Sequence, residues 1–199
     1  MPGFPRPPTL GFACSVEPIP LRRRIARCSS LCEHEPMTDR RPARHRALLW
    51  IGSFGPLGHL PASGTVTVAL VGVGLYRLLS AASESLYVAV TLLVTAAAVA
   101  IHDVGDRLLG EHDSRTLVWD EVAGFLWAVA FLPFTPRLAL LAVIVERTID
   151  IVKVPPARAI DRRWRGGFGA VADDLVAGLY TLAILHLVAH LAPRWVGVG

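Results

Sequence analysis

The sequence predicts an all-α protein, a membrane-embedded helical bundle with a Gly/Pro-rich loop near the N-terminal end of its folded domain. Of its 199 residues, 53% are hydrophobic and only 18% are charged, an unusually apolar balance for a soluble protein. The apolar residues also form blocks without Asp, Glu, Lys or Arg, including residues 85–101, 122–136 and 175–193. A bilayer crossing takes about 20 mostly apolar residues, with a range near 17–25. These blocks lie near that length, and the alternative is a soluble bundle with buried core helices.

The first 36 residues differ in composition from the rest of the chain. They contain all three cysteines, Cys14, Cys28 and Cys32, together with seven of the fifteen prolines. The apolar core of a secretory signal is missing, and Cys28, Cys32 and His34 have a weak spacing for a zinc finger. We therefore expect residues 1–36 to be a disordered tail or the product of a start codon assigned too early. The folded domain is expected at residues 37–199.

A basic segment opens this domain. Four arginines precede a short apolar segment at residues 48–51: Arg40, Arg41, Arg44 and Arg46. By the positive-inside rule, this pattern predicts a cytoplasmic anchor. Residues 52–65 then contain too much Gly and Pro for a spanning helix. We interpret them as a buried or re-entrant loop whose amides face an anionic group, and a plain connecting loop is the alternative.

Three helices are expected from the middle of the chain. The first covers residues 66–80, with Thr65 as its N-cap. The second covers residues 85–101 and continues until Gly110 ends it. Asp103 and Asp106 are expected in its solvated last turns. The third covers residues 137–152, and its face with Glu146, Asp150 and Lys153 predicts a salt-bridged surface.

Two adjacent acid pairs stand out because each opens an apolar run. Asp120-Glu121 is followed by an Ala-Gly step, and so is Asp173-Asp174. Carboxylates beside a low-dielectric region must be paired, hydrated or bound to metal. The small residues are expected to let two helices approach closely on the side that carries the acids. The sequence therefore predicts a cluster of hard oxygen ligands suited to a divalent cation.

The segment before the second acid pair is basic and rich in glycine. Arg162 lies in a stretch of arginines, and Gly166-Gly167 then leads into a helix. A glycine-rich turn at a helix start presents N–H groups to a phosphate, and we expect the acids in the first helical turn. His186 and His190 in the last apolar run are interpreted as packed or interfacial side chains.

Taken in order, these motifs resemble the phosphatidylglycerophosphatase A family, bacterial enzymes that remove the terminal phosphate of phosphatidylglycerophosphate to give phosphatidylglycerol. The resemblance covers roughly residues 52–178. It rests on the LPASGT loop, His112-Asp113, the Val-Trp-Asp-Glu motif ending at Glu121, Arg147 with Asp150 and Lys153, Pro156, Asp161-Arg162, the glycines at 166, 167 and 169, and Asp173-Asp174 with Ala177-Gly178. The chain departs from the family at Ser63, Thr67, Glu146 and Val154. Glu146 places an acid before the motif arginine, where the family has phenylalanine.

The resemblance implies Mg²⁺-dependent hydrolysis of a lipid phosphomonoester, within phospholipid biosynthesis. Its implied location is the bacterial inner membrane, in a multi-pass protein whose active site faces the cytoplasm. The acids implied for catalysis and metal binding are Asp120, Glu121, Asp173 and Asp174, with Asp113 and Asp150 as further ligands or as groups that support them. The residues implied or expected to bind substrate are Arg147, Lys153, Arg162, Gly166 and Gly167. A metal-bound water is the preferred nucleophile, and an attacking carboxylate is the alternative.

The expected partners are an anionic phospholipid and the membrane, and no nucleic acid. The sequence leaves the oligomeric state open. A competing hypothesis makes the protein a non-catalytic membrane scaffold or a cation transporter that uses the same acids as an ion path. A transporter is expected to carry its acids in the middle of an apolar segment, whereas both acid pairs stand at segment starts, which favours a site near the membrane surface.

Overall fold

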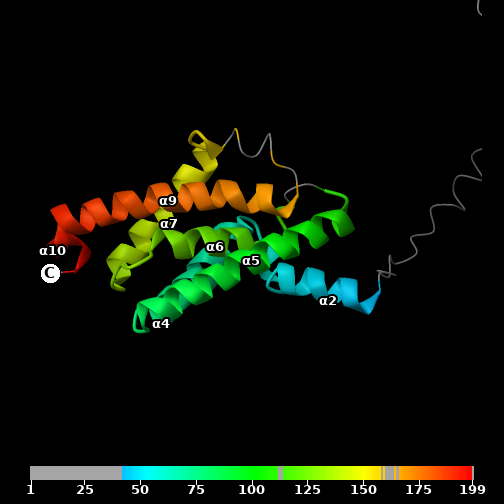
Figure 1. The fold of residues 1–199 in the computed structure, drawn as a ribbon, viewed down its shortest axis with the longest axis horizontal. Coiled ribbons are helices and arrows are strands. Elements are labelled where there is room, and N and C mark those ends of the chain that lie inside the picture. The colour runs from blue at the N-terminus through cyan, green and yellow to red at the C-terminus, as the bar shows by residue number, and fades with distance from the viewer. Residues whose placement is uncertain (1–41, 112–113, 158, 160–163, 165, 199) are drawn as a thin grey trace, which may run out of the picture. The chain divides into compact units, whose positions relative to one another are not determined.

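The computed structural model describes residues 42–111, 114–157, 159, 164 and 166–198. The expected tail at residues 1–36 lies outside these ranges, as do Asp113 and Arg162. The described residues form helices joined by turns, without a strand among them, which confirms the all-α prediction. In chain order the elements are α2 (Ala43–Gly52), η1 (Leu57–His59), α3 (Ser63–Thr67), η2 (Val68–Gly72), α4 (Val73–Leu79), α5 (Glu84–Leu109), α6 (Trp119–Ala128), α7 (Pro136–Val152), α9 (Gly167–Leu191) and α10 (Pro193–Val196) (Figure 1).

The two longest helices, α5 and α9, are long and apolar enough to cross a membrane. At about 1.5 Å per residue both exceed the roughly 30 Å of a bilayer's hydrocarbon core. Only 28% of the most apolar window of α5 and 44% of that of α9 are buried inside the protein, which favours membrane-facing helices over the core helices of a soluble bundle. Side chains such as Leu93 and Leu187 are exposed along them.

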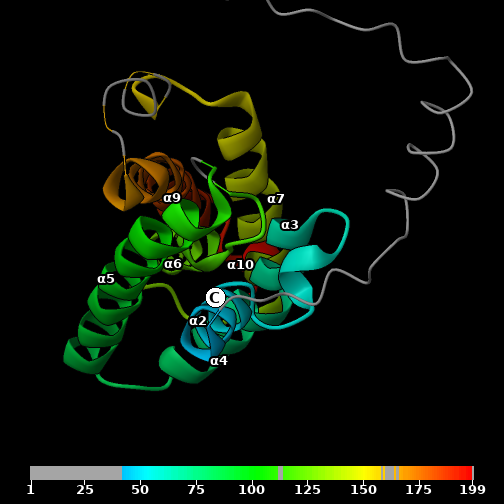
Figure 2. The same cartoon turned by 90° about the vertical axis from the view of Figure 1, so that its right-hand side faces the viewer.

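The helices α5 and α9 run antiparallel, and α9 begins beside the end of α5. The backbone N–H of Gly167 donates to Asp103 Oδ1 at 2.6 Å. Further along, Ala98 on α5 and Val171 on α9 share a core cluster with Ala123 of α6. The short helix α6 packs against both long helices. The helix α7 packs against α9 and, less extensively, against α6 (Figure 2).

The backbones of α6 and α9 approach each other closely. A Cβ added to Gly124 would lie 2.7 Å from the carbonyl oxygen of Asp174, and one added to Gly178 would lie 2.3 Å from that of Gly124. Only glycine allows backbones this close, so the two Ala-Gly steps bring α6 and α9 together, as the sequence predicts.

The chain leaves helical geometry after Ala128, although the apolar run continues to residue 136. Side chains from other helices satisfy carbonyls in and after the last turn of α6. The hydroxyl of Tyr87 donates to Leu126 O, and that of Tyr76 donates to Pro133 O at 2.7 Å. His186 Nε2 lies 3.1 Å from Ala130 O, so it packs against backbone as predicted. Non-helical backbone in an apolar environment is tolerated only when such partners exist.

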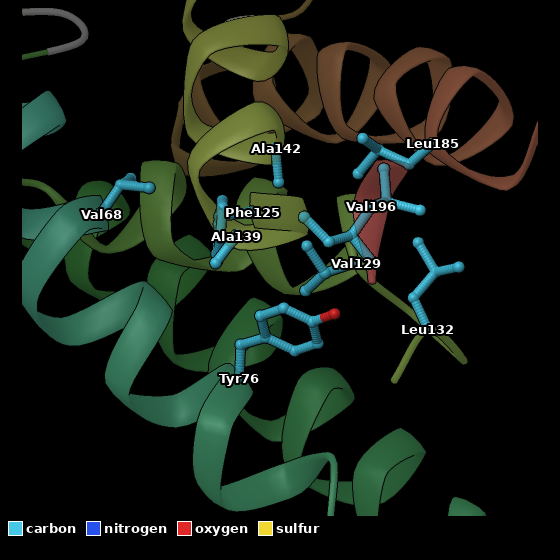
Figure 3. Close-up of a cluster of buried hydrophobic side chains, with 10 residues drawn as sticks. Val68, Tyr76, Phe125, Val129, Leu132, Ala139, Ala142, Leu185 and Val196 are labelled. Atoms are coloured by element: carbon cyan, nitrogen blue, oxygen red, sulfur yellow. The ribbon is translucent and has the colours of Figure 1, made fainter. Parts of the chain in front are cut away.

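The largest buried cluster joins α4, α6, α7, α9 and α10. Phe125 and Val129 of α6 and the following turn meet Tyr76, Ala142 and Leu185 from three other helices, as Figure 3 shows. Val196, from the short last helix, is fully buried in the same cluster. This core holds the far end of α6, so that its first turn is fixed where the two acid pairs meet.

Two helix starts differ from the sequence-based expectation. The helical rod Ser63–Leu79 begins before Thr65, and its N-cap is Ala62 in a left-handed conformation without a side-chain cap. Thr65 therefore lies in the first turn. The helix α9 begins at Gly167 because that residue packs against the backbone of α5. Asp173 and Asp174 consequently lie in its second turn, where the helix dipole is weaker than in the first.

Candidate active site

A cavity of about 810 Å³ opens where α6, α7 and α9 meet the segment around η1 and α3. Among the described residues that line it, five are acids and three are cations. The acids are Asp120, Glu121, Asp150, Asp173 and Asp174, and the cations are Arg115, Arg147 and Lys153. The Gly124–Gly178 crossing produces this arrangement, because Asp120 precedes Gly124 by four residues and Asp174 precedes Gly178 by four. Each acid therefore lies one turn from the contact point.

Arg147 lies among four carboxylates. Its Nε and Nη2 donate to the two carboxylate oxygens of Glu146, both at 2.7 Å. Nη1 lies 3.1 Å from Glu121 Oε2 and 3.6 Å from Asp150 Oδ2, and Nη2 lies 4.0 Å from Asp174 Oδ1. Glu146 and Arg147 are both buried. The predicted salt bridges are present on this helix, and those of Glu146 lie inside the protein, where its partner is the neighbouring Arg147.

The Glu146–Arg147 pair is ionised. Burial raises the pKa of Glu146 and lowers that of Arg147, whereas the hydrogen bonds between them act in the opposite direction on both groups. For Arg147 the surrounding carboxylates outweigh burial and raise its pKa. In two parallel N–H···O bonds both carboxylate oxygens act as acceptors. This geometry indicates that Glu146 and Arg147 are both charged.

Lys153 brings a second cation to the acids. It is the C-cap of α7, with a φ of 49°, and its Nζ lies 2.9 Å from Asp173 Oδ2. Its side chain keeps 32% of its exposure. The left-handed turn that ends α7 thus directs Lys153 across to α9.

Negative charge is crowded around Glu121. Burial raises its pKa to about 8, Arg147 opposes that rise, and the charges of Asp120, Glu146 and Asp150 add to it. A Cβ on Gly64 would lie 1.6 Å from Glu121 Oε2, so the α3 backbone lies directly over this carboxylate. Asp120 Oδ1 is buried and accepts no hydrogen bond from the residues that the structure describes, with His102 Nε2 3.3 Å away. Carboxylate oxygens are hard ligands, and a crowded, buried group of them is chemically suited to a divalent cation. No three acid or histidine side chains of the described residues are close enough together to form a metal-binding group.

Among the site residues that the sequence did not indicate are Arg115, in the cavity lining, and, behind that lining, His102. Its side chain is fully buried, with Nε2 3.3 Å from Asp120 Oδ1 and Nδ1 3.7 Å from Asp106 Oδ2. Asp106 is also buried, and its Oδ1 accepts the backbone N–H of Ser114 at 3.1 Å. The expectation of a solvated helix end is therefore wrong for Asp106. The four-residue spacing of His102 and Asp106 on an apolar helix was the available signal.

The two glycines expected to bind phosphate are not part of the cavity lining. The N–H of Gly167 points to Asp103, and Gly166 is the N-cap of α9 with a φ of 93°. Asp103 therefore closes the helix start that was expected to face a phosphate. The structure brings together Asp120, Glu121, Arg147, Asp150, Lys153, Asp173 and Asp174. Asp113 and Arg162 fall outside the part of the chain that it describes.

A comparison with models of known protein families shows to which family the chain belongs. Residues 50–189 match the family model described as Phosphatidylglycerophosphatase A, which is more than half of the sequence. The chain belongs to the phosphatidylglycerophosphatase A family. This family is named for a phosphatase, a phosphoric monoester hydrolase. All of the acids and cations that line the cavity lie within the matched range.

Individual relatives agree with the assignment. The chain is 29% identical to Phosphatidylglycerophosphatase A of Escherichia coli over 126 residues, which are 63% of this chain and 73% of that protein. It is 31% identical to the Haemophilus influenzae protein of the same name over 83 residues, which are 41% of this chain and 51% of that protein. A putative phosphatidylinositol-3-phosphatase of Bacteroides thetaiotaomicron is 28% identical over 138 residues, 67% of this chain and 82% of that protein. No solved structure matches the chain.

Proposed function

We propose that the protein hydrolyses phosphatidylglycerophosphate to phosphatidylglycerol and inorganic phosphate in a Mg²⁺-dependent reaction of phospholipid biosynthesis. The observation that carries this proposal is the cavity in which two acid pairs, from α6 and α9, meet three cations. Family membership supports the phosphatase chemistry and the lipid substrate.

The charge of the cavity supports the need for a cation. Its described lining has five carboxyl groups and three cations, so that the fully ionised cluster, the form that a metal ion would bind, carries an excess of two negative charges. A phosphomonoester dianion would be repelled by this excess. Asp120, Glu121, Asp173 and Asp174 would supply ligands to Mg²⁺, with Asp150 beside them, once their carboxylates move closer together than they lie in this structure. When bound, the ion supplies Lewis-acid neutralisation of the phosphoryl oxygens.

Residues of the chain itself orient the substrate, limit the access of water and hold the acids in place. Lys153 and Arg115 line the opening with positive charge that attracts and orients the phosphate. The α3 backbone at Gly64 covers Glu121 and limits the access of water to one side of the acid cluster. His102 and the backbone crossing behind the acids hold Asp120 in place.

The position of the site along α9 supports a substrate that stays in the bilayer. Asp173 lies six residues after the helix start at Gly167, or about 9 Å along the axis. Trp164 and Phe168 are partly exposed beside that start, and their ring centroids are 5.1 Å apart. Aromatic side chains of this kind prefer the headgroup region of a membrane. The cavity would then lie at headgroup depth, on the cytoplasmic face of a multi-pass protein of the bacterial inner membrane.

The test is phosphate release by the purified full chain in detergent. Phosphatidylglycerophosphate is expected to be hydrolysed, a chelator to stop the reaction, and Mg²⁺ to restore it. Asp120→Asn and Asp174→Asn, which keep shape and remove charge, are each expected to lower the rate about 10²-fold or more. Glu111→Gln, an exposed acid outside the cavity lining, is the matched control and is expected to keep the rate.

Two outcomes would change the proposal. Faster phosphate release from phosphatidylinositol 3-phosphate would keep the phosphatase and change its substrate, in line with the Bacteroides relative. An absence of release from either lipid at every Mg²⁺ concentration would favour the scaffold or cation-transporter hypothesis.

A further inference from the structure

The Glu146–Arg147 pair is unusual because its two members are consecutive residues of one helix. Side chains of consecutive helical residues point about 100° apart and do not face each other. The two 2.7 Å bonds therefore require the Arg147 side chain to fold back over Glu146. Glu146 is fully buried and is not part of the cavity lining. Its carboxylate therefore contacts the cavity only through Arg147, although its charge also raises the pKa of Glu121.

The two hydrogen bonds from Arg147 Nε and Nη2 to Glu146, called the fork below, determine where the rest of the guanidinium points. Arginine has five N–H donors in a fixed plane, and the fork uses Nε and one N–H of Nη2. Nη1 faces Glu121 and Asp150, and the edge with Nη2 faces Asp174. A phosphate that reached this guanidinium would have to displace carboxylates of the acid cluster.

The other two cations of the lining are placed differently. Arg115 is exposed at the opening, and the Lys153 side chain keeps a third of its exposure. Both are therefore accessible from the opening, and Lys153 is accessible although its Nζ pairs with Asp173, whereas the Arg147 side chain keeps only 10% of its exposure.

We propose that Arg147 is a permanent counter-ion of the acid cluster rather than a phosphate-binding residue, and that Glu146 is the positioning residue that holds it there. Contact with the substrate phosphate then belongs to Lys153 and Arg115. This inference rests on the proposed phosphatase function and reassigns the role that the family resemblance implies for Arg147.

The two roles predict different effects on Mg²⁺ affinity and on KM when the charge of Arg147 is removed. A counter-ion competes with a bound cation, because both neutralise the same carboxylates. Arg147→Met is therefore expected to tighten Mg²⁺ binding about tenfold, since one unit of positive charge leaves the cluster. A phosphate ligand would instead leave cation affinity unchanged and raise the KM for the lipid.

The experiment measures both quantities on the full chain in detergent. Isothermal titration with Mg²⁺ in the absence of lipid gives the cation affinity, and steady-state assays give kcat and KM. We expect Arg147→Met to bind Mg²⁺ more tightly, to lower kcat and to keep KM. We expect Lys153→Met to raise KM about tenfold, as the loss of a charged phosphate contact does. A raised KM with unchanged Mg²⁺ affinity in Arg147→Met would overturn the proposal.

A variant that retains the charge covers the possibility that Arg147→Met does not fold. Arg147→Lys loses the fork and keeps the charge, so cation affinity and KM are expected to stay as in the wild type while kcat falls. A tenfold rise in its KM would point to a phosphate ligand and contradict the inference. If the wild type hydrolyses no lipid at all, the proposed function fails, and the Mg²⁺ titrations still decide whether Arg147 is a counter-ion.

The role of Glu146 is tested by a double-mutant cycle. If Glu146 acts only by holding Arg147, Glu146→Gln lowers kcat in the wild type and has no effect in the Arg147→Met or Arg147→Lys background. Thr148→Val, an exposed position on the same helix, is the matched control and is expected to change neither constant. Equal effects of Glu146→Gln in all backgrounds would reduce Glu146 to a buried structural residue.

Discussion

The most informative single residue behind the site is His102. It lies between Asp106 and Asp120, and it joins the acid cluster to α5. Groups that orient a metal-binding carboxylate commonly contribute about 10–100-fold to metal affinity or activity. We expect His102→Asn to weaken Mg²⁺ binding about tenfold by titration calorimetry. The same substitution at the exposed His190 is expected to have no effect, and equal Mg²⁺ affinities of wild type and His102→Asn would exclude an orienting role.

Asp103 has a separate role at the start of α9. Its carboxylate accepts the N–H of Gly167 and lies 3.7 Å from Arg107. Loss of an N-terminal cap usually costs about 0.5–2 kcal/mol. Asp103→Ala is therefore expected to lower the thermal unfolding temperature in detergent without changing Mg²⁺ affinity. An unchanged unfolding temperature would show that α9 starts without help from α5.

These residues mark the limit of what the sequence could predict about the site. Asp120, Glu121, Asp173 and Asp174, which line the cavity, could be predicted as neighbours because adjacent acids at the start of apolar runs are visible in the sequence. The role of His102 depends on Asp120, which lies on another helix. The orientation of Arg147 depends on a side chain folding back on its neighbour, which helical spacing argues against. The contact of His102 with another helix and the rotamer of Arg147 leave no such local pattern in the sequence.

Among the elements, the crossing of α6 and α9 decides whether the site exists. Gly124→Ala or Gly178→Ala would place a methyl group against backbone atoms of the other helix. Overpacking of this kind typically costs about 1–3 kcal/mol, and here it would also separate the two acid pairs. We expect both variants to lose stability and phosphatase activity together.

The control for this prediction is another helical glycine. Gly74 on α4 has nothing within 4 Å of an added Cβ. Because alanine is favoured over glycine inside helices by about 0.5–1 kcal/mol, Gly74→Ala is expected to keep activity and to gain slight stability. If Gly124→Ala behaved like Gly74→Ala, the crossing would be looser than the structure has it.

The elements themselves were predictable to different degrees. Gly110 ends α5 in a left-handed conformation, and the Ala-Gly steps form the crossing, both as the sequence predicts. The early end of α6 was not predictable, because the run from 122 to 136 is uniformly apolar. The helix stops where Tyr76, Tyr87 and His186 supply partners for the carbonyls. Those partners come from three other helices.

At the scale of the whole molecule, the antiparallel pair α5 and α9 predicts a topology. The end of α5 and the start of α9 lie together with the cavity, whereas the start of α5 lies at the other end. With Cys14, Cys28 and Cys32 replaced, we expect Glu111→Cys to be labelled only from the cytoplasm in sealed vesicles. Ser85→Cys, also at an exposed position, is expected to be labelled only from outside. Labelling of both from one side would contradict a bilayer crossing by α5.

The short helix α10 has a practical consequence for producing the protein. Val196 is buried among residues of the main cluster, Trp195 O accepts a bond from Arg137 Nη1, and Thr135 Oγ1 donates to Val196 O. The last turn of the chain is therefore not a neutral handle for purification. Trimming residues 193–198 would remove packing and hydrogen bonds that hold the start of α7, so we expect a fusion partner beyond them to need a flexible linker.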